Sequence, residues 1–212
     1  MLHRRATLLA LLSCTALLAC GDQAPATLAM PAGATVLALG DSLTAGVGAK
    51  DGQDWPSLLA ERTGWDIVNA GVSGDTSAQG LARLPDLLHT HAPSLVIVGL
   101  GGNDFLRRAA PANTTEALTQ VVQQIQATNA QVVLVAIPQP SVLAAAGATP
   151  SDHPLYAALA DKLHVPLAAN LWGPILGDAS LRADQVHANA QGYAAFAQAL
   201  EAVLRQQGFL KH

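Results

Sequence analysis

The chain has 212 residues, of which 50% are hydrophobic and 12% charged, so it can bury one sizeable core and we expect one folded domain. The formal net charge of −4 offers no basic surface to a phosphate backbone, which argues against nucleic acid as a partner. Cys14 and Cys20 are the only cysteines, and both precede the expected domain, so no disulfide is expected within it.

The N-terminal residues have the pattern of an export signal. A basic start at 3–5 precedes an apolar segment at 6–18 that is too short to span a membrane. The sequence Leu-Leu-Ala-Cys at 17–20 resembles a bacterial lipobox, which implies lipid modification of Cys20. Cys14 ends a similar sequence, but cleavage there leaves a very short apolar segment. An ordinary secretory signal, cut after Ala19 or further on, stays open as the alternative.

We therefore expect a signal peptide at 1–19, a lipid-anchor cysteine with a flexible tether at 20–33, and the domain at 34–212. Removing residues 1–19 takes away Arg4 and Arg5 and no acid, so the mature formal charge is 9 minus 15, or −6. The expected location is the cell envelope, periplasmic or extracytoplasmic. The lipid anchor at Cys20, rather than basic residues, would hold the protein at the membrane.

The domain begins with an apolar run at 35–39, which predicts a buried strand and is followed at once by Gly-Asp-Ser-Leu at 40–43. A strand that ends in a glycine and a small polar turn brings a serine hydroxyl to the carboxyl edge of a sheet, where α/β folds carry their sites. Ser42 is therefore the first candidate nucleophile. Asp54 predicts the N-cap of a helix over 54–62, and a second strand is expected at 66–72.

Thr76 and Gln79 form a capping box for the next helix, in which Pro85 predicts a kink or a fresh helix start. The run at 94–99 has almost no polar alternation, as expected for a strand that is covered on both faces. It ends in Gly-Gly-Asn-Asp at 101–104, a second polar turn at a strand end.

Asn113 and Glu116 predict the cap of a helix with an apolar inner face that runs to Ile125. A fourth strand is expected at 131–137 and a fifth at 165–171. Between them lie a long Ala/Pro/Gly loop at 138–152 and a helix at about 154–164, and a last helix is expected at 189–207.

Strands that alternate with helices predict a three-layer α/β/α fold around a mostly parallel sheet of about five strands. The turns that hold Ser42, Gly74 and Asn103 follow the first, second and third strands. They are therefore expected to meet at the carboxyl edge of the sheet.

A serine hydroxyl needs a base, a group that orients the base, and donors for an oxyanion. Asp184 and His187 lie three residues apart just before the last helix, a spacing that brings a carboxylate against one ring nitrogen while the other faces outward. They supply the base and its orienting group for Ser42. Thr44 stands where a G-x-S-x-G elbow needs glycine, which argues against the α/β-hydrolase fold.

Four ordered segments instead resemble the SGNH (GDSL) hydrolase superfamily: Gly40–Leu43, the second-block glycine at Gly74, Asn103 within 101–104, and Asp184–His187. The likeness spans about 36–193 and is greatest to the small bacterial thioesterase/arylesterase/lysophospholipase branch. It implies a flavodoxin-like SGNH-hydrolase fold. In the family's last block a proline often follows the histidine, whereas this chain has Ala188 there.

The resemblance implies that Ser42 attacks an ester carbonyl, that His187 takes and returns the proton, and that Asp184 holds the imidazole. The oxyanion would be bound by the backbone N–H groups of Ser42 and Gly74 and by the side-chain amide of Asn103. No cofactor and no metal is needed.

Other polar residues have structural interpretations. His89 and His91 are read as a solvated helix end rather than a metal site, since no Cys, Asp or Glu clusters with them. Asp41 and Asp104 are expected to shape their turns by accepting backbone N–H bonds. Asn113 begins a glycosylation sequon but is interpreted as a helix cap. Two further aromatic residues, Trp55 and Trp65, are interpreted as packing residues.

Phe105 and Val186 are the candidate residues of the substrate pocket. Close relatives often have glycine at the position of Phe105, so its ring is expected to narrow the acyl side of the pocket and to favour short or aryl esters. The loop at 138–152 is expected to cover the same pocket and, by its length, to be mobile.

The sequence thus predicts a monomeric serine esterase that acts on small carboxylic esters, with thioesters and lysophospholipids as further candidate substrates. One alternative is an O-acetyl esterase that acts on envelope polysaccharide. The other is a tethered binding protein without catalysis.

Overall fold

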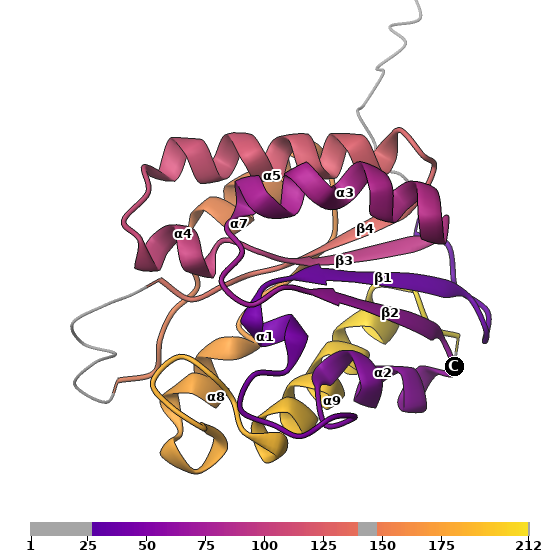
Figure 1. The fold of residues 1–212 in the computed structure, drawn as a ribbon. Coiled ribbons are helices and arrows are strands. Elements are labelled where there is room, and N and C mark those ends of the chain that lie inside the picture. Colours follow the sequence, from indigo (N-terminus) through magenta and orange to yellow (C-terminus); the bar gives the residue numbers. More distant parts are fainter. Residues whose placement is uncertain (1–26, 140–147, 212) are drawn as a thin grey trace, which may run out of the picture.

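The computed structural model describes residues 27–139 and 148–211. It has three layers, with one β-sheet between two layers of helices (Figure 1). The sheet has the strand order β2-β1-β3-β4-β5, and every strand pair is parallel. The predicted three-layer α/β/α fold is therefore confirmed.

The strands lie close to the predicted positions. They are β1 (Thr35–Gly40), β2 (Asp66–Gly71), β3 (Leu95–Gly99), β4 (Gln131–Val135) and β5 (Leu167–Ala168). All residues of β3 are buried, as its continuous apolar run predicts. The fifth strand has only two residues, much shorter than the predicted 165–171, because it pairs with β4 only at two positions.

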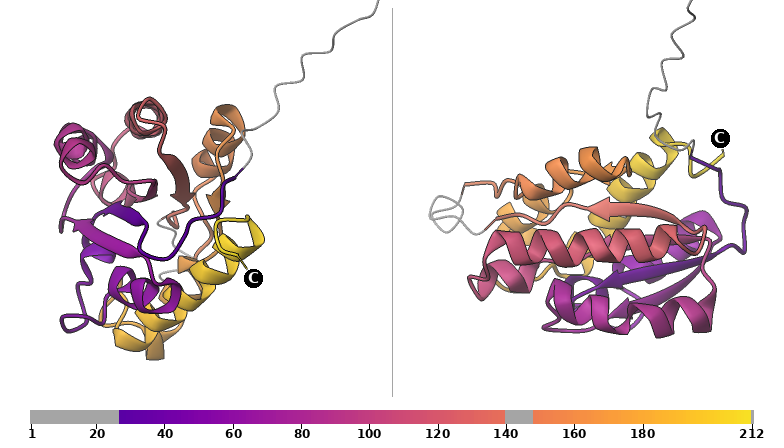
Figure 2. Two further views of the ribbon diagram at one scale, coloured as in Figure 1. Left: turned by 90° about the vertical axis from the view of Figure 1, so that its right-hand side faces the viewer. Right: turned by 90° about the horizontal axis from the view of Figure 1, so that it is seen from above.

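One face of the sheet is covered by α3 (Ser77–His91), α5 (Pro111–Gln126) and α7 (Leu155–Leu163). The other face carries α1 (Ser42–Ala45), α2 (Trp55–Thr63), α8 (Trp172–Gly177) and α9 (Ala190–Gln206), as Figure 2 shows from two further sides. The short α4 (Gly102–Leu106) follows β3, and a 3-10 turn at Ala179–Leu181 follows α8. No described helix is long and apolar enough to cross a membrane.

Side-chain caps define the start of several helices. Asp54 caps α2, and its carboxylate accepts the Ser57 N–H at 3.0 Å. Thr76 and Gln79 form the predicted capping box of α3. That helix continues through Pro85 as a single element rather than starting afresh there. Asn189 caps α9 by accepting the Gly192 N–H.

The predicted cap of α5 is wrong. The helix begins at Pro111, and its N-cap residue Ala110 makes no side-chain hydrogen bond. Proline is suited to a first helical turn because its ring presets φ and it has no N–H to satisfy, so the helix starts without the expected side-chain cap. Asn113 lies inside the helix and is exposed.

The core is built from the strands and from buried residues of the helices on both faces, with an aromatic cluster contributed by α2, α8 and α9. Trp172 stacks on Phe196 with ring centroids 3.9 Å apart, and Trp55 packs on the same ring at 5.5 Å. Trp55 and Trp65 are both buried, as their interpretation as packing residues requires. This packing fixes the start of α9, which directly follows the segment that carries Asp184 and His187.

The stretch at 20–33, expected to be a tether, is described from residue 27 onward. Leu28 exchanges two hydrogen bonds with the Gln131 side chain, and the Met30 N–H donates to the Phe209 carbonyl. Met30 is also buried in the core. Residues 27–33 therefore lie against the domain. The expected signal peptide, its cleavage site and Cys20 lie outside the described residues.

Candidate active site

Ser42 lies at the carboxyl edge of the sheet, at the first position of α1 and two residues after the end of β1. Asp41 caps this short helix, and its carboxylate accepts the Leu43 N–H at 3.0 Å. The turn is tightly packed, because a Cβ added at Gly40 would overlap the Thr44 side chain. The Asn69 amide of β2 donates to the Thr44 carbonyl at 2.9 Å and so fixes the end of α1.

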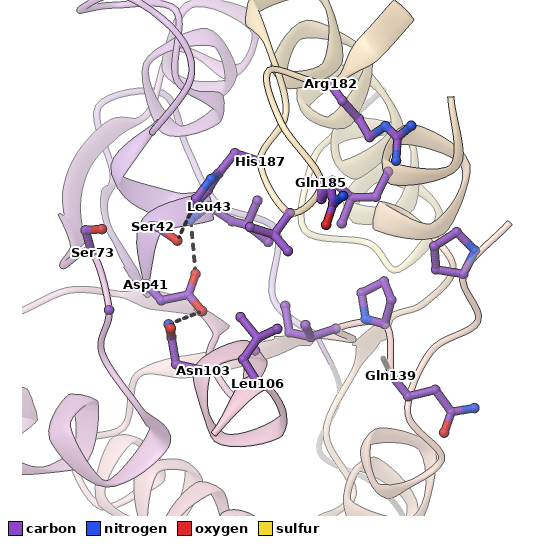
Figure 3. Close-up of a pocket in the computed structure, with 17 residues that line it drawn as sticks. Asp41, Ser42, Leu43, Ser73, Asn103, Leu106, Gln139, Arg182, Gln185 and His187 are labelled. Carbon is purple, nitrogen blue, oxygen red and sulfur yellow. Dashed lines mark hydrogen bonds between the residues drawn. The ribbon is translucent and has the colours of Figure 1, made fainter. Parts of the chain in front are cut away.

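Three side chains form a continuous hydrogen-bonded chain at this edge. The Ser42 Oγ lies 2.9 Å from His187 Nε2, and His187 Nδ1 lies 2.7 Å from Asp184 Oδ2. In Figure 3 the His187 ring stands directly over the Ser42 hydroxyl. Residues separated by 145 positions thus meet as the sequence predicts. With Nδ1 protonated toward Asp184, Nε2 is free to accept the serine proton.

Asp184 is held in place by its own loop. Its Oδ1 accepts the N–H groups of Val186 and His187, both at 2.8 Å. Burial raises the pKa of Asp184, but the hydrogen bond to the His187 ring and the two backbone N–H bonds outweigh it, so the pKa lies below its ordinary value. The carboxylate is therefore ionised at neutral pH and stabilises a protonated imidazole.

Direct contact joins the loop after α1 to the segment that carries the imidazole. Gly48 has a φ of +100°, and a Cβ added there would overlap the Ala188 carbonyl and the Ala183 side chain. The Tyr193 hydroxyl of α9 also donates to the Val47 carbonyl at 2.7 Å. Ala188 is fully buried at this contact, so the segment is closely packed without the proline that is often found at that position in the family.

The predicted oxyanion donors lie beside Ser42. Within the described residues, the backbone N–H groups of Ser42 and Gly74 donate no hydrogen bond. Gly74 has a φ of +87°, and its carbonyl accepts the Arg107 guanidinium at 2.7 Å. The Asn103 amide Nδ2 donates to the Asp75 carbonyl at 3.0 Å and to Asp41 Oδ2 at 3.3 Å. An oxyanion would replace the longer of these two bonds.

Asp41 connects the nucleophile turn to the Asn103 amide, and only 2% of it is exposed. Burial raises the pKa of Asp41 to about 6, although the Leu43 N–H and the charge of His187 oppose the rise. Its expected structural role, that of accepting a backbone N–H in its turn, agrees with the Leu43 bond. Asp104 instead accepts the N–H and hydroxyl of Ser77 at the start of α3.

A pocket of about 530 Å³ opens over Ser42, a size typical of small-molecule sites. Val186 lies in its wall, but Phe105 does not. The Phe105 ring stacks on His153 at 4.5 Å and meets Tyr156 edge-on, because this side of α4 faces α7, and Leu106 of the same helix lines the pocket instead. The predicted narrowing of the pocket by Phe105 is therefore wrong.

The loop expected at 138–152 lies partly outside the described residues. Its two ends pair, since the Gln139 N–H donates to the Ser151 carbonyl and the His153 N–H to the Ile137 carbonyl. Residues from both ends, including Pro138 and Pro150, line the pocket. The base of this loop therefore forms a wall of the site.

The sequence of this chain matches a known family over most of the domain. The model of the GDSL-like lipase/acylhydrolase family matches residues 38–195. The chain belongs to this family.

Curated relatives of this GDSL-like protein include thioesterase 1/protease 1/lysophospholipase L1 of Escherichia coli K12, which is 48% identical over 111 residues. Esterase TesA of Pseudomonas aeruginosa is 47% identical over 111 residues. These matches cover 50% of this chain and 52% and 55% of the two relatives, so the chain spans about half the length of the curated relatives it matches. The crystal structure of TesA superposes with a TM-score of 0.73 at 33% identity and covers 82% of this chain and 99% of that one.

The structure of the GDSL-like domain also shows site residues that the sequence does not indicate. Arg83 of α3 forms an ion pair with Asp75 at 2.7 Å and donates to the Gly40 carbonyl at 2.9 Å, so it connects the turns after β1 and β2. Arg182 lines the pocket, and no short motif marks it. Within 27–139 and 148–211, no group of three His, Cys, Asp or Glu side chains could hold a metal ion.

Proposed function

We propose that the protein is a serine esterase that hydrolyses carboxylic esters through a covalent acyl-enzyme. The observation that carries this proposal is the unbroken hydrogen-bonded chain from Ser42 through His187 to Asp184, whose first two members line a pocket of small-molecule size. Two similar proteins, esterase TesA and thioesterase 1/protease 1/lysophospholipase L1, have names that support the same class of reaction.

In the first step, Ser42 Oγ attacks the ester carbonyl while His187 Nε2 takes the hydroxyl proton. The carbonyl oxygen becomes an oxyanion that is bound by the N–H groups of Ser42 and Gly74 and by Asn103 Nδ2. Each such donor contributes about 100- to 1,000-fold in rate in measured oxyanion holes.

Protonated His187 then gives its proton to the departing alcohol, which leaves an ester between Ser42 and the acyl group. In the second step, water attacks this acyl-enzyme, again with His187 as the base. The acid departs and Ser42 recovers its proton, so the enzyme returns to its starting state. Asp184 stays ionised throughout and stabilises the imidazolium in both steps.

The test is hydrolysis of p-nitrophenyl acetate by the wild type and by Ser42→Ala. The wild type is expected to release nitrophenol, and Ser42→Ala is expected to be inactive. Ser73→Ala is the matched control, because Ser73 lines the same pocket and no described hydrogen bond uses its hydroxyl. A fluorophosphonate probe is expected to add covalently to wild type and Ser73→Ala but not to Ser42→Ala. Equal hydrolysis by wild type and Ser42→Ala would refute the proposal.

The same assay addresses the two alternatives. A tethered binding protein would hydrolyse no ester in the wild type. A panel of acetylated sugars beside simple acyl esters would show whether an O-acetyl esterase activity dominates.

A further inference from the structure

The pocket has two chemically different ends. Ser42, His187 and Asn103 lie together at one end, and Arg182, Gln185 and Gln139 lie at the other (Figure 3). Apolar side chains also line the pocket: Leu106, Ile137, Leu176 and Val186. A substrate that fills the pocket therefore presents its reacting carbonyl to one end, an apolar segment to the wall, and its remote end to polar groups.

Two basic side chains, Arg182 and His187, are among the described residues that line this pocket, and of these Arg182 is the one that is charged at every physiological pH. It is partly buried, and none of the ion pairs among the described residues includes it. The hydroxyl and N–H of Ser180, which both donate to Asp178 Oδ1, and the more distant charge of Arg182 hold the pKa of the Asp178 carboxyl below its ordinary value. The sequence at 140–147 contains no acidic residue. Among the described residues, no carboxylate lies within ion-pair distance of the Arg182 guanidinium, so its N–H groups can bind a further anion.

The backbone holds Arg182 in a fixed relation to the reacting groups. Arg182 pairs with Ala188 across the loop that carries Asp184 and His187. Its carbonyl accepts the Asn189 amide at 3.3 Å, and the Asn189 N–H donates to the Leu181 carbonyl at 2.9 Å. Only the long side chain of Arg182 is left to adjust, so its charge stays at one end of the pocket.

We propose that Arg182 is a specificity-determining residue that binds an anionic group of the substrate, at the end remote from the ester carbonyl. A guanidinium pairs with planar oxyanions such as carboxylates through two parallel N–H bonds. The preferred substrate class is then an ester whose apolar chain ends in a negatively charged oxygen group. This inference rests on the proposed esterase function and extends it to the substrate.

The test compares two esters with the same eight-carbon acyl chain. One is p-nitrophenyl octanoate, which ends in a methyl group, and the other is mono-p-nitrophenyl suberate, which ends in a carboxylate. Wild-type kcat/KM is expected to be higher for the suberate ester. In Arg182→Gln it is expected to fall about 10- to 100-fold for the suberate ester, chiefly through KM, and less than about 2-fold for the octanoate ester.

A second pair places the charge on the leaving group: 4-acetoxybenzoate and its methyl ester. If Arg182→Gln lowers kcat/KM only for 4-acetoxybenzoate, the anion is bound on the alcohol side of the ester. If it lowers kcat/KM only for the suberate ester, the anion is bound on the acyl side. Either result supports the proposal. Arg182→Lys keeps the charge and is expected to lose less than Arg182→Gln. Arg108→Gln is the matched control, since Arg108 is exposed and outside the pocket lining.

If Arg182→Gln lowers kcat/KM equally for charged and neutral esters, the proposal is overturned, because Arg182 then only supports the structure of its loop. Unchanged kcat/KM for every ester would overturn it too. In both cases hydrolysis of the neutral ester by the wild type would leave the esterase function standing. If the wild type hydrolyses no ester, the esterase function fails and this proposal fails with it.

Discussion

The buried carboxyl of Asp41 is predicted to destabilise the folded protein at neutral pH. In the unfolded chain this group ionises near 3.8, whereas burial in the fold raises its pKa to about 6. Between these pH values the folded state holds a proton that the unfolded state has released, so the free energy of unfolding falls as the pH rises. At 1.36 kcal/mol per pKa unit, a rise from 3.8 to about 6 corresponds to about 3 kcal/mol above pH 6.

The perturbation is Asp41→Asn, which removes the titration and keeps the shape. An asparagine amide can still accept the Leu43 N–H, but its own NH₂ would face the NH₂ of Asn103. The variant therefore loses the hydrogen bond from Asn103, which costs about 1 kcal/mol of folding free energy at every pH. The quantity to measure is therefore how the stability difference between the variant and the wild type changes with pH.

The assay is urea unfolding of both proteins from pH 4 to pH 8. The free energy of unfolding of Asp41→Asn, relative to the wild type, is expected to rise by about 2 to 3 kcal/mol over this range. Asp51→Asn, at an exposed aspartate, controls for the loss of a surface charge. A difference that stays constant with pH would refute the reasoning, since the wild-type carboxyl would then titrate alike in both states.

Three further outcomes are expected. Asn103→Ala removes a proposed oxyanion donor and should lower kcat about 100- to 1,000-fold with KM little changed; a change in KM alone would contradict this role. Trp172→Ala removes a fully buried ring stacked on Phe196 and should lower the free energy of unfolding by about 3–5 kcal/mol in urea titrations, and a loss below 1 kcal/mol would show that the stack contributes little. Cys20→Ser should move the protein from the membrane fraction to the soluble fraction, and unchanged fractionation would contradict lipid anchoring.

The parts of the fold that the sequence predicts are those with strong, regular signals. Apolar runs indicated β1, β3 and β4, and the capping box of Thr76 and Gln79 indicated the start of α3. The meeting of Ser42 with His187 could also be predicted, since parallel strands place their carboxyl ends at one edge and the D-x-x-H spacing fixes the imidazole.

Other features depend on tertiary contacts that leave no periodic pattern. The short helices α4 and α8 are too brief to show an amphipathic repeat, and β5 is set by two pairs with β4. Phe105 and Leu106 are adjacent apolar residues, and only the orientation of α4 decides which of them faces the pocket. The position of Arg182 depends likewise on a bridge to Ala188.

The contact at Gly48 has a consequence for how the enzyme tolerates change. A surface loop normally accepts almost any residue, yet a methyl group at Gly48 would overlap the carbonyl oxygen of Ala188, the residue after His187. The hydrogen bond between Ser42 Oγ and His187 Nε2 is 2.9 Å long, and it would be weakened if this distance grew by more than a few tenths of an ångström. The backbone at Gly48, which packs against the residue after His187, is thus expected to influence how His187 is aligned with Ser42. Gly48→Ala would test how much misalignment of these two proposed catalytic residues the activity tolerates.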